Sequence, residues 1–257
     1  MELLIVGGGR MGEALLGGLL AAGRELAVAE VSPARREELA AAYPDVEIVE
    51  TPIAADGAAL VVKPGDVAEA ARAVADAGAG RILSVAAGVT TRAIEEAAGR
   101  TLPVVRAMPN TPALVRAGAA AISPGSSAGE DDLAWAEEIL GAVGVVVRVP
   151  ETQLDAVTGL SGSGPAYVFV VAEAMAEAGV LAGLPRAEAE TLAFQTLLGA
   201  ARLLVEGGDS PAALRAAVTS PGGTTAAGLR ELERHGVRAA FLEAVTAAAE
   251  RSRELGA

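Results

Sequence analysis

The chain changes character at residues 160–169, which read LSGSGPAYVF. Before this stretch, short β-branched runs alternate with Ala-rich helical segments, and after it only helical patterns follow. Residues 167–179 are apolar on nearly every face, apart from two glutamates. A helix of this kind has to be buried against several neighbours. We therefore predict an α/β domain over residues 1–150 and an all-α domain over residues 151–257, with 167–179 as its central helix.

Composition narrows the class of protein. The 257 residues are 52% hydrophobic, which is enough for a core, and the net charge of −13 argues against nucleic-acid binding. The absence of cysteine excludes disulfides and cysteine-ligated metals and suits a reducing cytoplasm. The N-terminus reads as a strand without the basic region of a signal peptide, and no apolar run approaches the ~20 residues that span a bilayer. We expect a soluble, cytoplasmic protein with no membrane partner.

Strand and helix patterns alternate through the first domain. This alternation predicts an open, mainly parallel sheet, with two further strands at its edge flanking a helix over residues 131–142. The expected strands lie at residues 3–6, 26–30, 46–49, 58–62, 81–85 and 102–106, and the two edge strands at 118–123 and 145–149. In the second domain we expect helices near residues 151–158, 163–182, 186–206, 210–217, 222–235 and 237–255.

A glycine motif joins the first strand to the first helix. Gly7, Gly9 and Gly12, with Arg10 and Met11 inside the turn, have the G-x-G-x-x-G spacing of dinucleotide-binding loops. Glycine lets the backbone approach a pyrophosphate, which the helix N-terminus then stabilises. A glycine-rich turn can be only a turn, but its place between a strand and a helix favours cofactor binding in a Rossmann-type domain.

The end of the second strand carries the residues that would choose the cofactor. Glu30 stands eighteen residues after Gly12, where an acid binds the ribose 2′-hydroxyl of NAD. Arg35 and Arg36 follow and could instead hold a 2′-phosphate. All three could also be solvated charges at a helix start.

Other unusual loops fall at the carboxyl ends of later strands. Lys63, the only lysine, and Pro64 follow the fourth strand, and Ala86, Ala87 and Gly88 follow the fifth. Residues 107–112, AMPNTP, follow the sixth. In a parallel sheet these loops meet at the edge where open α/β sheets bind ligands. Because Ala-Ala-Gly offers no side-chain obstacle, a flat ring could lie against it.

A second candidate site opens a helix in the all-α domain. Residues 220–225, SPGGTT, combine an N-cap residue, a proline, two glycines and three hydroxyls. Exposed backbone N–H groups at such a helix start form a receptor for a small carboxylate. An ordinary helix cap is the alternative, although it would need only one of the hydroxyls. Ser220, Gly223, Thr224 and Thr225 are the candidate residues.

The remaining side chains argue against other chemistries. The only histidine, His235, lies in a charged helix end, and Ser161 and Ser163 have no evident histidine partner. These facts argue against a Ser–His hydrolase and a His-ligated metal site. Hydride transfer needs little from the protein, because the cofactor carries the chemistry and the fold orients it.

Five motifs in order resemble the pyrroline-5-carboxylate reductase family. They are residues 61–65 (VVKPG), 84–89 (SVAAGV), 106–112 (RAMPNTP), 160–167 (LSGSGPAY) and 220–225 (SPGGTT). The resemblance implies NAD(P)H-dependent reduction of the cyclic imine Δ1-pyrroline-5-carboxylate to L-proline, the last step of proline biosynthesis. It also implies a Rossmann domain and a helical domain that interlocks with a second subunit, often in larger rings of dimers.

The resemblance also implies residue roles. Gly7, Gly9 and Gly12 would hold the pyrophosphate, while Lys63, Pro64 and Ala86 to Gly88 would line the nicotinamide and its ribose. Ser220, Gly223 and Thr224 would bind the substrate carboxylate, and Thr225 would face the imine nitrogen. The family's usual polar or basic residues for a 2′-phosphate are not evident where this chain has Glu30 and Val31. NADP(H) and NAD(H) are both candidates, and we expect NADH to be used at least as well as NADPH.

Two other readings compete. A β-hydroxyacid dehydrogenase would need a catalytic lysine four residues beyond Gly164, where this chain has Val168. A nucleotide-sensing protein without catalysis would need the glycine loop but not the hydroxyl-rich loop at 220–225. Formation of proline from the imine and NAD(P)H separates the enzyme from the sensor.

Overall fold

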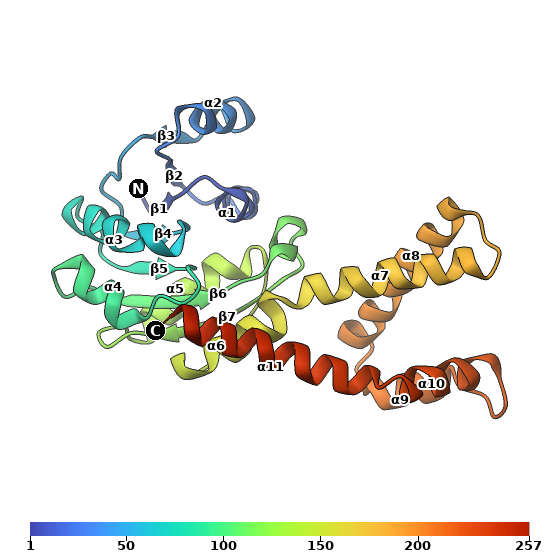
Figure 1. The fold of residues 1–257 in the computed structure, drawn as a ribbon. Helices are drawn as coiled ribbons and strands as arrows, with labels where there is room; N and C mark the ends of the chain where they lie inside the picture. The colour runs from blue at the N-terminus through green and yellow to red at the C-terminus, as the bar shows by residue number, and fades with distance from the viewer. Residues whose placement is uncertain (257) are drawn as a thin grey trace. The chain divides into compact units, whose positions relative to one another are not determined.

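The computed structural model describes residues 1–256 and divides into two compact units. The first unit comprises Met1–Ser163 together with the residues from Val245 onward, and the second is Gly164–Ala244. Figure 1 traces the chain through both. The C-terminal half of the last helix therefore belongs to the unit that begins the chain.

An eight-stranded sheet in the order β3-β2-β1-β4-β5-β6-β7-β8 forms the centre of the first unit. All neighbours from β3 through β6 are parallel, β7 is antiparallel to β6, and β8 is parallel to β7. This arrangement confirms the predicted α/β class with a mainly parallel sheet. The strands are β1 Leu3–Val6, β2 Leu26–Ala29, β3 Glu47–Val49, β4 Gly57–Leu60, β5 Ile82–Ser84, β6 Val104–Met108, β7 Gly118–Pro124 and β8 Gly144–Arg148.

One strand prediction needs correction. We expected β7 and β8 both to be edge strands, but β7 lies between β6 and β8 and pairs with each. Its burial agrees with this interior position, since Ala120 to Ser123 are buried. The edge strand is β8, whose Val145 and Val147 are exposed.

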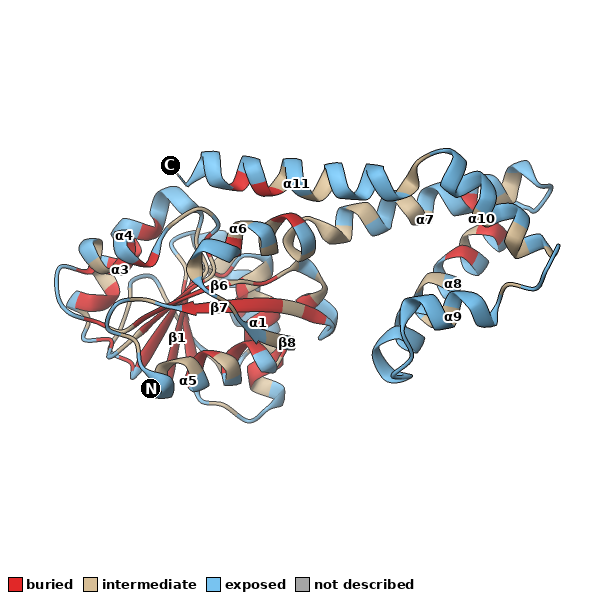
Figure 2. Cartoon of the chain, turned by 90° about the horizontal axis from the view of Figure 1, so that it is seen from below, coloured by how far each residue is buried: buried red, intermediate tan, exposed pale blue. Residues whose placement is uncertain are grey.

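Helices cover both faces of this sheet. One core layer packs the apolar sides of α1 and α5 against the strands, and the other packs α3 and α4. Figure 2 shows the burial running through the strands and along the inner side of these helices. Their bounds are α1 Arg10–Ala21, α2 Pro33–Ala42, α3 Val67–Asp76, α4 Thr91–Ala98 and α5 Glu130–Gly141, with 3-10 turns η1 Pro64–Asp66, η2 Thr111–Val115 and η3 Glu151–Gln153.

The end of the first unit is less regular than the helix we expected over residues 151–158. A single α-turn, α6 Leu154–Val157, leads into the π-helical turn η4 Thr158–Gly162. Gly159 is buried against the last helix. A Cβ at this position would lie 2.5 Å from the carbonyl oxygen of Val245, so the close approach requires glycine. Nearby, the Ser252 hydroxyl donates to the Asp155 carboxylate at 2.6 Å. These contacts fix the C-terminal helix to the first unit.

The second unit is entirely helical, as predicted. It contains α7 Gly164–Leu181, α8 Arg186–Glu206, α9 Pro211–Ala217, α10 Thr224–Arg234 and the start of α11 Val237–Leu255. The most extensive contact between its helices is that of α7 with α8, which form a hairpin. The absence of a side chain at Gly179 lets α7 approach Ala189 closely.

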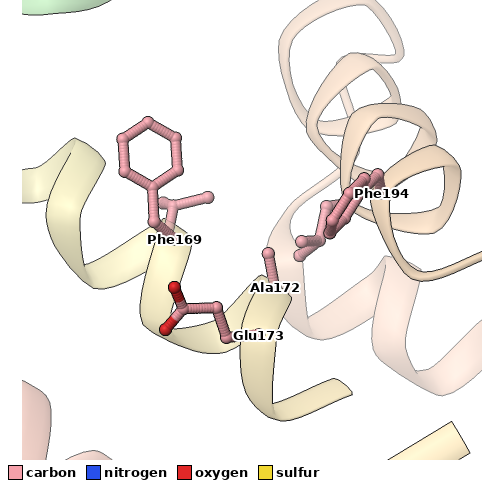
Figure 3. A pocket seen from close by; sticks show the side chains of 6 residues that line it. Phe169, Ala172, Glu173 and Phe194 are labelled. Carbon is pink, nitrogen blue, oxygen red and sulfur yellow. The ribbon is translucent and has the colours of Figure 1, made fainter. Parts of the chain in front are cut away.

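The prediction that residues 167–179 are buried is wrong for the single chain. In α7 only Ala176 is buried, while Phe169 is 62% exposed, and Figure 2 shows the second unit as largely exposed. Figure 3 shows Phe169 and Phe194 on α7 and α8, with Ala172 and Glu173 beside them. Together with Val168 and Leu197, these residues line an open apolar groove.

Candidate functional site

The glycine loop is shaped by close contacts that exclude side chains. Gly7 has a φ of +105°, and a Cβ there would lie 2.5 Å from the Val61 carbonyl oxygen at the end of β4. A Cβ at Gly12 would collide with the carbonyl oxygen of Gly7. The Gly7 N–H donates to the Ala29 carbonyl at 2.8 Å. The loop therefore lies where β1, β2 and β4 end together.

Gly9 differs from its two partners. A Cβ at Gly9 would meet no heavy atom within 4 Å, so packing inside the protein does not require glycine there. Gly9 is the N-cap of α1, and no side chain caps the helix. Arg10 is exposed in the first turn and Met11 is half-buried. An uncapped helix start behind an open glycine fits a pyrophosphate.

Glu30 lies directly beside this loop. One carboxylate oxygen accepts a hydrogen bond from the Gly8 N–H at 2.8 Å, and the other accepts one from the Ser32 N–H at 2.8 Å. Gly8 is itself buried, and a Cβ there would collide with Leu39 of α2. The structure thus brings Glu30 together with the glycine loop.

The two arginines after Glu30 are occupied by contacts within the protein. Arg35 donates to the Gly8 carbonyl at 2.7 Å, to Glu13 at 2.5 Å and to Glu38 at 2.8 Å. Its hydrogen bonds to Glu38 and Glu13 raise its pKa further above the ordinary arginine value. Arg36 donates to the Glu30 and Val31 carbonyls at 2.8 and 2.9 Å and lies 3.3 Å from Glu50.

The loops after β4 and β5 flank the glycine loop on its other side. The side chain of Lys63 is exposed, and Pro64 begins η1. Ala86 is buried and Ala87 is exposed.

Gly88 is less open than its sequence suggested. It has a φ of +76°, and a Cβ there would lie 3.4 Å from the backbone of Leu255 and Gly256. The end of α11 therefore covers this side of the loop, which leaves Ala87 as the exposed part of the Ala-Ala-Gly segment.

Asn110 holds separate segments together, a role that its place in the motif at residues 106–112 did not predict. Its amide oxygen accepts from the Ala119 N–H at 2.8 Å, and its amide nitrogen donates to the Ser161 carbonyl at 3.1 Å. One side chain thus connects the loop after β6 to β7 and to the π-turn. The available signal was an asparagine between Pro109 and Pro112 after a strand, but Ser161 is distant in sequence.

A second unforeseen cluster surrounds Glu151. Its carboxylate accepts from the N–H and the hydroxyl of Thr91, both at 2.8 Å, and from buried Arg106 at 3.1 Å. Burial acts to raise the pKa of Glu151, but these hydrogen bonds outweigh it, so the pKa lies below the ordinary glutamate value. The cluster joins α4, β6 and η3.

The hydroxyl-rich loop lies in the second unit, at the start of α10. Gly222 has a φ of +67°, and Gly223 is the N-cap, with no side chain capping the helix. Ser220 and Thr224 are exposed, Thr225 is half-buried, and the Gly223 N–H donates to the Ser220 carbonyl at 3.1 Å. None of the three hydroxyls makes a capping hydrogen bond to the start of α10, so the first N–H groups of the helix have no side-chain acceptor.

Metal binding has no structural candidate in residues 1–256, where no three His, Asp or Glu side chains cluster suitably.

Comparison with known proteins decides the family. A family model for pyrroline-5-carboxylate reductase dimerisation matches residues 151–255, and one for coenzyme F420-dependent NADP oxidoreductases matches residues 2–88. A pyrroline-5-carboxylate reductase from Synechocystis sp. is 47% identical, and the alignment covers 100% of this chain and 98% of the relative. The chain belongs to the pyrroline-5-carboxylate reductase family. The predicted family and enzyme class, an NAD(P)-dependent oxidoreductase, are confirmed.

Solved pyrroline-5-carboxylate reductases have the same fold. That from Coxiella burnetii is 37% identical with a TM-score of 0.93, and covers 100% of this chain and 98% of its own. That from Plasmodium falciparum, with NADP bound, is 26% identical with a TM-score of 0.85 and the same coverages.

The family model also explains the exposed apolar helices. By length and composition alone, Glu151–Leu181 could cross a membrane, although the sequence predicted no membrane-spanning segment. This stretch lies inside the match to the reductase dimerisation model. The second unit therefore carries a homo-oligomerisation surface, and both α7 and α8 expose large apolar side chains.

Proposed function

We propose that this protein reduces Δ1-pyrroline-5-carboxylate to L-proline with NAD(P)H, the last step of proline biosynthesis. The observation that carries the proposal is the 47% identity with a pyrroline-5-carboxylate reductase along the whole chain. Two features of the structure support it independently. They are the open, uncapped start of α1 behind Gly9 and the uncapped start of α10 behind Gly223.

The cofactor is held by residues of the first unit. The N–H groups at the start of α1, after Gly7, Gly9 and Gly12, bind the pyrophosphate, and exposed Arg10 adds positive charge beside it. Lys63, Pro64 and Ala87 line the ribose and nicotinamide at the ends of β4 and β5. When bound, the reduced nicotinamide supplies a hydride.

The substrate is held by the loop that opens α10. Backbone N–H groups after Gly223, with the hydroxyls of Ser220 and Thr224, bind the ring carboxylate. The Thr225 hydroxyl donates to the neutral imine nitrogen or accepts from the N–H of the iminium, and introduces no charge. The C=N carbon takes up the hydride. The nitrogen of the iminium keeps the proton that it already carries, and a neutral imine takes one proton from solvent, so a secondary amine results.

The same proposal covers the assembly and its location. Residues 1–150 bind the dinucleotide, and residues 151–257 bind substrate and form the subunit contact. The protein is a soluble homodimer, and the family resemblance implies that such dimers often form larger rings. Its charge of −13 and its lack of cysteine suit the cytoplasm.

The proposal is tested by adding Δ1-pyrroline-5-carboxylate to the purified protein with NADH or NADPH. Oxidation of the reduced cofactor should depend on the imine, and proline should form in equal amount. A matched control omits the imine, and a second control replaces it with proline. Folded protein that binds the cofactor but makes no proline would be a nucleotide sensor instead of a reductase.

A further inference from the structure

We propose that Glu30 makes the nucleotide site selective for NADH over NADPH. This inference rests on the proposed function, since it concerns the cofactor of the same reaction. It starts from the position of Glu30 at the end of β2, next to the glycine loop. Here the 2′-position of the adenosine ribose lies in dinucleotide-binding folds, where a hydroxyl meets an acid and a phosphate meets a cation.

The Glu30 carboxylate is fixed and still has capacity to accept. A carboxylate offers about four lone-pair sites, and the N–H groups of Gly8 and Ser32 take one on each oxygen. The ribose 2′- and 3′-hydroxyls are donors that match the remaining sites. A 2′-phosphate is an anion with no donor to offer, so it would face a carboxylate that these N–H bonds hold in place.

The nearby cations do not replace this missing attraction. Each nitrogen of the Arg35 guanidinium already donates, to Gly8 and to two carboxylates. Arg36 supports the backbone of Glu30 and Val31 and reaches Glu50. Three glutamate carboxylates therefore pair with the two arginines, and Glu30 adds a fourth negative charge nearby. This excess of negative charge opposes a 2′-phosphate. The charges at this site therefore do not suit the 2′-phosphate of NADP. The Plasmodium falciparum relative, by contrast, was solved with NADP bound.

Binding measurements test the role of Glu30 without relying on turnover. Isothermal titration calorimetry of the intact protein, without imine, gives the Kd of NADH and of NADPH. We expect NADH to bind at least about tenfold more tightly, or ~1.4 kcal/mol. Glu30→Gln keeps an acceptor for Gly8 but removes the charge, and should reduce the NADH preference about tenfold. Glu30→Ser should do the same, and steady-state kcat/KM ratios should follow.

Glu25→Gln is the matched control, because it removes an exposed carboxylate at the opposite end of the same strand. It should leave both Kd values unchanged. A parent protein that binds NADPH as tightly as NADH overturns the inference, as does a Glu30→Gln variant with the parental ratio. These outcomes leave the reductase activity intact. Failure to bind either nucleotide would instead contradict the proposed function together with the inference.

Discussion

Gly9 and Gly12 of the nucleotide loop require glycine for different reasons, which alanine substitutions should distinguish. Gly9→Ala adds a methyl group to open space, so the stability should stay near parental while the Kd of the cofactor rises. Gly12→Ala forces a Cβ against the Gly7 carbonyl and should cost ~1–3 kcal/mol of unfolding free energy. Denaturant unfolding and calorimetric binding of NADH measure both effects.

Gly17→Ala is the control in the same helix, because its Cβ would lie 3.7 Å from the Tyr43 hydroxyl, an ordinary contact. It should stabilise the helix by roughly 0.5–1 kcal/mol. If Gly9→Ala unfolds the protein, or binds NADH as the parent does, Gly9 has no role at a pyrophosphate.

Thr225 is the residue whose loss should affect the chemical step. In the proposed function its hydroxyl contacts the nitrogen that gains electron density during hydride transfer, so Thr225→Ala should lower kcat more than it raises KM. We expect a loss of at most about 100-fold, the low end for general acid catalysis, because water can substitute. Ser220→Ala should mainly raise KM. If a folded Thr225→Ala protein keeps the parental kcat, Thr225 has no part in the chemical step and only begins the helix.

Residue spacing predicted that Glu30 follows the glycine loop by one strand–helix–strand unit, and the structure places the two side by side, but spacing did not predict how the surrounding side chains are connected. The interval from Gly12 to Glu30 follows from a strand–helix–strand unit, so local pattern was sufficient. The contacts of Arg35 with Glu13 and of Asn110 with Ser161 join residues 22 and 51 positions apart. Such partners depend on tertiary packing, which a single sequence does not encode in local periodicity.

At the scale of elements, the Glu151 cluster connects three segments and makes stability depend on pH. Glutamate in an unfolded chain titrates near pH 4.3, and the folded pKa of Glu151 lies lower. Its contribution to stability is therefore full above the unfolded value and is lost as pH falls through the folded value. Glu151→Gln should lower the unfolding free energy by about 1–2 kcal/mol at pH 7.

The difference between parent and Glu151→Gln should shrink steadily below about pH 4.3. Urea unfolding at a series of pH values measures it. Glu37→Gln, an exposed acid on α2, is the control and should match the parent throughout. A difference that stays constant from pH 7 down to acid would show that Glu151 acts through packing and not through its charge.

The approximate extent of most elements followed from sequence pattern, whereas the neighbours of each element did not. The helix expected over residues 131–142 is close to α5 Glu130–Gly141, and the side chains of Ser32 and Thr90 cap α2 and α4. The placement of β7 between two strands was missed, because alternation in sequence does not reveal which edge a late strand joins. The π-turn at Thr158–Gly162 was missed for a similar reason. Gly159 packs against the backbone of Val245, which is 86 residues away in the sequence.

At the scale of the whole molecule, we expect a second copy to bind at the exposed apolar side of α7. Phe169→Asp places a charge on this surface and should increase the monomer fraction measured by light scattering at micromolar concentration. Ala40→Asp, on the exposed side of α2, is the matched control and should remain oligomeric. A folded and active parent monomer would contradict the assembly.

Hydride transfer to the imine is tested most directly by following the hydride itself. The protein is given Δ1-pyrroline-5-carboxylate and NADH carrying deuterium at the transferred position of the nicotinamide, and the proline is analysed by mass spectrometry. A single deuterium should be found on the ring carbon that was double-bonded to nitrogen. Proline without deuterium, or oxidation of the cofactor without proline, would contradict the assignment of this protein as an imine reductase.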